Sequence, residues 1–277
     1  MQTLVVLSIL FLAALQHGTQ QPPTDPQATH SGHTNTVDAV TDGKPIPADL
    51  DPLQDAGVSA ADRVQALEVQ AKTAHESVAA AAWKAIQACD TCLAANDLAE
   101  VLASRPATEL QPLIGSLLAK MQSETTPRPR AAAARALLAL PIDQQPAEVK
   151  ALQPIRLKTI SVVGRMAWDP KEFTVAPASL VCMKMENPDT MQHNMLLVAP
   201  NSISEIGVAA EKMGEGLLGK RRQFVPDNPK VLQVMGLVAP GHTGEMWFFA
   251  PQKPGTYPLV CTYPGHWRLM NGKLKVK

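Results

Sequence analysis

The spacing of apolar residues changes near Pro154, which separates an Ala-rich part of the chain from a part with short alternating runs. Before Pro154, apolar positions recur with a helical period in segments of high helix propensity. Prolines separate these segments, and a proline inside a helical pattern is expected to end the helix. The pattern predicts short helices over residues 59–71, 79–88, 98–102, 108–121 and 130–140, with breaks at Pro106, Pro127, Pro129 and Pro141.

The first of these helices is expected to bury an apolar stripe that consists of Val64, Leu67, Val69 and Ala71. Short antiparallel helices punctuated by proline imply a small helical bundle or a fragment of an α-solenoid. The Arg-Ala-rich segment 130–140 resembles the second helix of HEAT-type repeats. The helical region is therefore either a platform on which a partner docks or a bundle that simply packs.

After Pro154 the period becomes that of β-strands. Turn signals such as Asp169-Pro170, Asn187-Pro188 and Asn271-Gly272 separate the apolar runs. Short strands at this spacing are typical of a β-sandwich, and residues 202–218 interrupt them with a helical excursion. The predicted strands cover residues 159–163, 172–175, 180–187, 191–198, 230–238, 245–250, 256–261 and 273–276.

The chain begins with an apolar run over residues 4–15, followed at once by a polar, Pro-rich stretch. The run is too short for a comfortable membrane span and matches the apolar core of a signal peptide. We expect a signal peptide over residues 1–20, a disordered linker over 21–57, an α-helical region over 58–150 and an all-β domain over 155–277. The linker histidines, His30 and His33, are expected to be solvated.

Composition excludes one broad class of function. The chain has 277 residues, and its 25 Lys and Arg balance its 25 Asp and Glu. A nucleic-acid-binding protein would need a basic stripe, so no nucleic-acid partner is expected. The length allows two modest domains with separate cores.

One short segment near the C-terminus carries the candidate chemistry. Cys261, His266 and Met270 follow one another as Cys-x4-His-x3-Met, and His193 lies upstream beside Asn194. Two imidazoles, one thiolate and a weak axial thioether are the ligand set of a blue-copper electron-transfer site. Zinc would prefer four strong ligands in a tetrahedron, and haem would need different signals. We expect one copper ion that cycles between Cu(I) and Cu(II).

The other cysteines and one histidine have plainer interpretations. Cys89 and Cys92 are spaced as Cys-x-x-Cys, which indicates a local disulfide in an oxidising compartment or two buried thiols on a helix. Cys182 has no obvious mate, and strand alternation places it on the face opposite Met183. His242 lies in a turn and is expected at the surface.

Residues 160–277 resemble a cupredoxin, and specifically azurin. The C-terminal sequence Cys-Thr-Tyr-Pro-Gly-His-x-x-Leu-Met-x-Gly-x-Leu-x-Val-Lys follows the azurin C-terminus, and Met191-Gln-His-Asn194 is similar to azurin's Met-Gly-His-Asn. The stretch from Ser202 to Val231 resembles the helical flap of azurin. The resemblance implies an all-β Greek-key sandwich behind the small all-α region.

The resemblance also implies residue roles. His193, Cys261 and His266 would be equatorial ligands, and Met270 would be axial. Gln192 stands where azurin has a glycine whose carbonyl makes a second, long axial contact, and its side chain is expected to crowd that position. The amides of Asn194 and Tyr263 would donate hydrogen bonds to the thiolate. Electrons would leave through an exposed edge of His266, within an apolar patch of Met191, Met213, Tyr263 and Trp267.

The expected function is that of an exported, periplasmic or secreted, type 1 copper protein that carries single electrons. Its partners would be redox proteins such as c-type cytochromes or periplasmic oxidoreductases, and the mature chain would have no stable membrane span. Copper enzymes need additional His pairs, commonly His-x-His, and this sequence has none. As an alternative, the helical region would be a docking module that tethers the copper domain to a larger redox complex.

Overall fold

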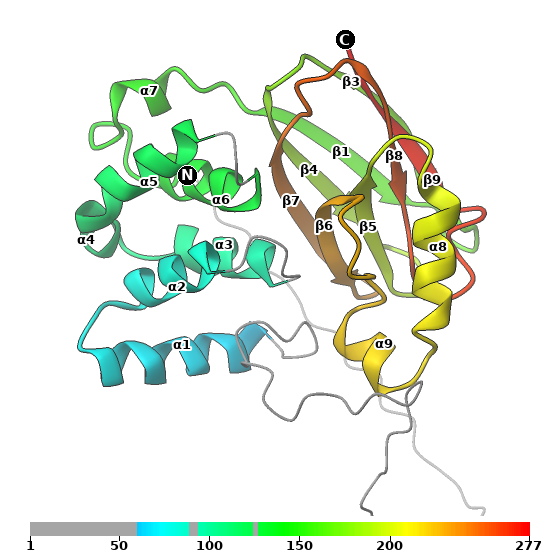
Figure 1. Ribbon diagram of the computed structural model, residues 1–277, viewed down its shortest axis with the longest axis horizontal. Helices are drawn as coiled ribbons and strands as arrows, with labels where there is room; N and C mark the ends of the chain where they lie inside the picture. The colour runs from blue at the N-terminus through cyan, green and yellow to red at the C-terminus, as the bar shows by residue number, and fades with distance from the viewer. Residues whose placement is uncertain (1–59, 89–93, 124–126) are drawn as a thin grey trace, which may run out of the picture. The chain divides into compact units, whose positions relative to one another are not determined.

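A computed structural model describes residues 60–88, 94–123 and 127–277 (Figure 1). These residues all belong to one compact unit. The expected signal peptide, the linker with His30 and His33, and the pair Cys89 and Cys92 lie outside the described residues. Within the described ranges, no helix is both long and apolar enough to cross a bilayer.

The first part of the described chain is helical, as predicted. Ser77 caps one of these helices, because its hydroxyl accepts a hydrogen bond from the backbone N–H of Ala80. The apolar stripe predicted for the first helix is partly wrong, since Val69 is 62% exposed while Leu67 and Ala71 are buried. Positions two apart on a helix face different directions, so Val69 cannot share the buried face of Leu67. The helices are α1 (Ala60–Ala74), α2 (Val78–Gln87), α3 (Ala95–Ala103), α4 (Ala107–Leu110), a 3₁₀ turn (Gln111–Leu113), α5 (Ile114–Gln122), α6 (Pro127–Leu138) and α7 (Ala147–Lys150).

One proline acts differently from the prediction. A break before Pro127 is confirmed, since α5 ends at Gln122 and α6 begins at Pro127, but Pro129 lies within α6 and does not break it. The first turn of a helix tolerates proline, because its N–H groups have no partner within the helix. The helix predicted over residues 108–121 is instead divided into α4, a 3₁₀ turn that contains Pro112, and α5.

The second part is a sandwich of two sheets, which confirms the predicted fold class. The four-stranded sheet has the order β2-β1-β4-β7 and the five-stranded sheet has the order β3-β9-β8-β5-β6. The sequence did not indicate β2, which is only two residues long. The strands are β1 (Ile155–Ser161), β2 (Trp168–Asp169), β3 (Glu172–Val175), β4 (Leu180–Glu186), β5 (His193–Val198), β6 (Val231–Val238), β7 (Thr243–Phe249), β8 (Gly255–Val260) and β9 (Asn271–Val276).

Strand β4 is apolar on both faces, and each face belongs to a different core. Met183 and Met185 lie in the core between the two sheets. Leu180 and Cys182 alternate with them and pack into the core of the helical region, together with Trp247 of β7. Cys182 is a buried free thiol on the face opposite Met183, as strand alternation predicted.

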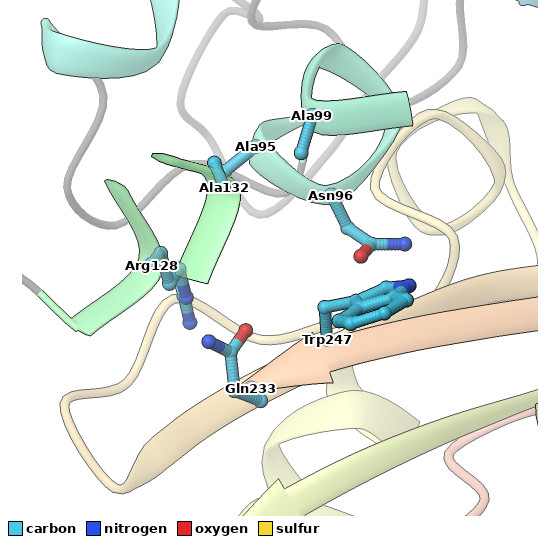
Figure 2. Close-up of a pocket in the computed structure, with 7 residues that line it drawn as sticks. All are labelled: Ala95, Asn96, Ala99, Arg128, Ala132, Gln233 and Trp247. Carbon is cyan, nitrogen blue, oxygen red and sulfur yellow. The ribbon is translucent and has the colours of Figure 1, made fainter. Parts of the chain in front are cut away.

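Arginine and asparagine side chains add polar contacts where helices meet the four-stranded sheet. The guanidinium of Arg130 lies 3.8 Å from the ring centroid of Phe249, and the Asn96 amide donates to the Glu245 carbonyl at 2.8 Å. Packing here leaves a small pocket of about 10 Å³, close to the smallest volume that can admit one water molecule. Figure 2 shows its lining residues, Ala95, Asn96, Ala99, Arg128, Ala132, Gln233 and Trp247.

The predicted helical excursion is present as two helices, α8 (Ile203–Lys212) and α9 (Leu217–Arg221). Ile206 of α8 packs with Trp267 and with the outward side chains of β5, β6 and β8. Gly207 faces Trp267 so closely that a Cβ atom there would overlap carbons of the indole ring. The excursion is therefore fixed against the loop that follows β8.

We expect Gly207→Ala to lower the free energy of unfolding by about 1–3 kcal/mol, because an extra methyl in a packed core forces neighbours to move. Gly115→Ala is the matched control, since no atom lies within 4 Å of the Cβ position there. That control should leave stability unchanged or raise it slightly, because alanine favours helix. Urea denaturation of the three proteins checks this; equal midpoints would mean that Trp267 is not held against α8.

Candidate metal centre

Strand pairing brings the candidate ligands together from distant parts of the sequence. His193 is the first residue of β5, and Cys261 directly follows β8. These strands are antiparallel neighbours, with Leu196 opposite Val260. Strand β9 pairs with β8 on its other side, so residues 262–270 form a loop between two paired strands.

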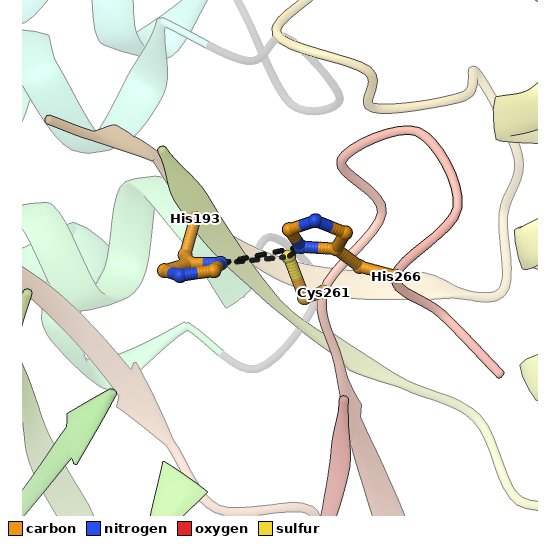
Figure 3. A group of neighbouring side chains, drawn as sticks. All are labelled: His193, Cys261 and His266. Atoms are coloured by element: carbon orange, nitrogen blue, oxygen red, sulfur yellow. Dashed lines mark hydrogen bonds between the residues drawn. The ribbon is translucent and has the colours of Figure 1, made fainter. Parts of the chain in front are cut away.

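The donor atoms of three side chains converge at this end of the five-stranded sheet (Figure 3). The Nδ1 atoms of His193 and His266 are 3.2 Å apart. The sulfur of Cys261 lies 3.9 Å from Nδ1 of His193 and 3.6 Å from Nδ1 of His266. All three side chains are buried, so the group is shielded from water.

This triangle has the size that a metal ion requires. A point equidistant from the three donor atoms lies about 2.1 Å from each, and metal–imidazole and metal–thiolate bonds measure roughly 2.0–2.3 Å. Two imidazoles and a thiolate in a trigonal arrangement suit copper. The residues present therefore fit the group that the sequence implies.

Backbone hydrogen bonds fix the loop that carries His266 and Met270. The N–H of Met270 donates to the His266 carbonyl at 2.8 Å, and the N–H of Cys261 donates to the Met270 carbonyl at 3.0 Å. Gly265 has φ +81°, a conformation that favours glycine, and this turn precedes His266. Met270 is fully buried in the same core cluster as Cys261.

Asn194 connects β5 to the loop and to the helical excursion. Its side-chain oxygen accepts from the N–H of Thr262 at 2.7 Å. Its amide nitrogen donates to the Thr262 hydroxyl and to the Gln223 carbonyl, both at 2.8 Å. His193 therefore stays in register with Cys261 through side-chain contacts as well as through the strand ladder.

Burial sets the protonation of the donor groups. It raises the pKa of the Cys261 thiol to about 12, although the backbone N–H groups of Tyr263 and Asn194 donate to the sulfur and act in the opposite direction. It lowers the pKa of His266 to about 4, and it also lowers the pKa of His193. Both imidazoles are therefore neutral at neutral pH and can donate a lone pair, whereas the thiol loses its proton only when a cation compensates the thiolate charge.

A fourth buried polar side chain, Asp189, was not identified from the sequence. Its Oδ2 atom lies 3.2 Å from Nε2 of His193, on the side of the ring away from Cys261. Asp189 precedes His193 by four residues in the turn that begins at Asn187. An acidic residue just before a candidate ligand is a signal that could have found it.

The structure corrects the expected electron port and the expected crowding by Gln192. His266 is only 1% exposed and Trp267 only 8%, so neither presents an open edge. Trp267 is instead covered by α8, a contact that joins segments about 60 residues apart and has no local sequence signal. Gln192 is exposed, so it does not crowd the buried donor atoms.

Three residues of the expected patch and His242 lie where the surface is at least partly open. Met191, Met213 and Tyr263 are half-buried, and the ring of Tyr263 is 4.9 Å from that of His266. His242 is exposed, as predicted.

Comparison with known proteins places the same segment within one family. The family of copper binding proteins, plastocyanin/azurin family, matches residues 156–277. Auracyanin-A of Chloroflexus aurantiacus is 30% identical over 125 residues, which cover 44% of this chain and 75% of that protein. Auracyanin-B of the same organism is 34% identical over 91 residues, which cover 31% of this chain and 36% of that protein.

A solved structure is also similar. Auracyanin A, described as a "blue" copper protein from the same green thermophilic photosynthetic bacterium, has 29% sequence identity and a TM-score of 0.41. The match covers 45% of this chain and 100% of that chain.

Proposed function

We propose that this chain, which belongs to the plastocyanin/azurin family of copper-binding proteins, holds one copper ion through His193, Cys261, His266 and Met270. The chain is a type 1 copper electron carrier. The observation that carries the assignment of ligands is the buried triangle of two Nδ1 atoms and one sulfur. Gln192 would add at most its backbone carbonyl.

The protein's own contribution to electron transfer is to hold the donor atoms still. Copper, when bound, supplies the one-electron couple. His193 and His266 are neutral donors, and Cys261 provides a thiolate that receives two backbone N–H groups. Because Asn194 and the ladder of β8 and β9 fix these groups, little of the site would need to move when the charge changes by one. Burial of these three side chains keeps water away from the donor atoms.

We propose that the chain is a carrier and not an enzyme. Its seven histidines include no His-x-His pair, which a second, catalytic copper commonly uses. As a cupredoxin it transfers electrons to redox partners, and c-type cytochromes or periplasmic oxidoreductases are the partners we propose. Half-buried Tyr263, next to His266, offers one way toward the surface.

The alternative role of the helical region, as a docking module, concerns residues 58–150. Helices α3 and α6 share a buried core with Leu180, Cys182 and Trp247 of the four-stranded sheet. Such a shared core suits a rigid extension of the copper domain better than a loose tether. A docking role would therefore use the outer surface of the helices.

Cys261→Ser should abolish the intense absorption band near the red end of the visible spectrum, because that band originates on the thiolate sulfur. Cys182→Ala is the matched control, since Cys182 is also a buried free thiol but lies outside the ligand cluster. Absorption spectra of both copper-loaded variants check this. A blue Cys261→Ser protein would overturn the ligand assignment.

Met270→Leu should retain copper and colour and raise the reduction potential, because a weak donor to Cu(II) is lost. We expect the equilibrium between Cu(II) and Cu(I) to shift about tenfold toward Cu(I), which is about 59 mV in the reduction potential for one electron. Met183→Leu, a change of another fully buried methionine in the same core, should leave the potential unchanged. Redox titration decides, and loss of all copper from Met270→Leu would make Met270 a principal ligand.

We propose export to the periplasm or the cell exterior, on the basis of the apolar run at residues 4–15. The mature chain should begin near Gln20, with the linker over 21–57, the helical region over 58–150 and the copper domain over 155–277. N-terminal sequencing of protein from the native source tests this. An intact Met1 in a cytosolic fraction would contradict export.

A further inference from the structure

Asp189 is the side chain near the metal centre that the ligand set leaves unexplained. It is 3% exposed, although a buried carboxylate is costly unless it is paired or hydrogen-bonded. Its Oδ2 atom lies 3.2 Å from Nε2 of His193, whose Nδ1 atom faces the sulfur of Cys261 and the ring of His266. The carboxylate and the ligand triangle thus lie on opposite sides of one imidazole.

This arrangement selects one tautomer of His193. A neutral imidazole carries one proton, and a ligand nitrogen must offer its lone pair. An ionised carboxylate only accepts hydrogen bonds, so Oδ2 favours the proton on Nε2. Nδ1 is then free to bind metal in the orientation that the triangle requires.

The position of Asp189 is itself determined by the turn that contains it. Its Oδ1 atom accepts from the backbone N–H of Thr190 at 2.7 Å and from that of Gly164 at 3.3 Å. Its own N–H donates to Oδ1 of Asn187 at 3.2 Å. Oδ1 is thus occupied by two backbone N–H donors, and Oδ2 is left to accept from Nε2 of His193.

Asn187 anchors this turn to both sheets. Its Oδ1 atom also accepts from the Ser161 hydroxyl of β1 at 2.6 Å. Its amide nitrogen donates to the carbonyls of Met191 and of Val238, the latter at the end of β6, each at 2.8 Å. A carboxylate held in this way has little freedom to turn away from His193.

We propose that Asp189 is the positioning residue of the metal centre, which fixes the Nε2–H tautomer of His193 and supplies a buried negative charge that lowers the reduction potential. The inference rests on the proposed ligand set. A fixed negative charge favours the more highly charged Cu(II) over Cu(I), and the effect is strong where water is excluded. Partners that accept the second N–H of a metal-bound histidine also commonly raise metal affinity, because they fix the tautomer and the orientation of the ring.

The test compares Asp189→Asn, which removes the charge but keeps the shape, with Asp189→Ala, which removes both. Asp227→Asn is the control, since Asp227 is an exposed carboxylate of the same domain. Redox titration of the copper-loaded proteins should show a shift toward Cu(I) of about tenfold, or about 59 mV, for Asp189→Asn. Asp227→Asn should match the wild type. Potentials of both Asp189 variants within the error of the wild type would overturn the proposed charge effect.

A second measurement needs no variant. Nitrogen-15 NMR of the wild-type protein should find His193 protonated on Nε2 both before and after Cu(I) is added. Asp189→Ala should show a mixture of tautomers before Cu(I) is added, together with copper affinity reduced about tenfold. An Nδ1–H tautomer in the metal-free wild type would overturn the positioning role. A wild-type protein that never becomes blue would instead refute the proposed function, so the two failures are distinguishable.

Discussion

Antiparallel pairing of β5 with β8 is the constraint on which the rest of this site depends. It brings His193 beside Cys261, 68 residues further along the chain. The second imidazole and the thioether need no such help, because they follow Cys261 within one short loop. Asn194 reinforces the same pairing with two hydrogen bonds to Thr262. The ladder therefore decides whether a triangle of donor atoms exists at all, and the loop decides its size.

A buried cluster of two imidazoles, a thiol and a carboxylate is unfavourable in a protein core unless each polar group has a partner. Here the partners form a continuous series. Backbone N–H groups serve the sulfur of Cys261, Asp189 accepts from His193, and Asn187 holds the turn that carries Asp189. The remaining cost falls on the lone pairs and the thiol at the centre, which a copper ion relieves. The site is thus most stable when it is loaded.

The sequence predicted those parts of this arrangement that local patterns encode. Three of these patterns are local: the spacing of Cys261, His266 and Met270, the alternation of apolar faces along β4, and the helical excursion. The structure shows Cys261 and Met270 in one buried core, two apolar faces on β4 and a helix in the excursion. The buried state of Trp267 was missed, because it depends on the contact of that side chain with α8. Asp189 was missed for a different reason: it lies only four residues before His193, but the sequence does not show that the turn brings its carboxylate to Nε2 of that imidazole. The break predicted at Pro129 was wrong, because proline disrupts the interior of a helix but is tolerated in its first turn.

The apolar outer face of the four-stranded sheet explains why the helical region packs against it. In a sandwich exposed to water, side chains that point away from the core are expected to be polar. Here the outward positions of β4 and β7 include Leu180, Cys182 and Trp247. Exposed together, they would form an apolar patch that favours aggregation or binding. Ala-rich α3 and α6 can approach such a surface closely because alanine is small, while the guanidinium of Arg130 covers the face of the Phe249 ring. The copper domain and the helices are therefore complementary parts of one unit. One face of the four-stranded sheet packs in the same core as Cys261 and Met270, and its other face requires the helices.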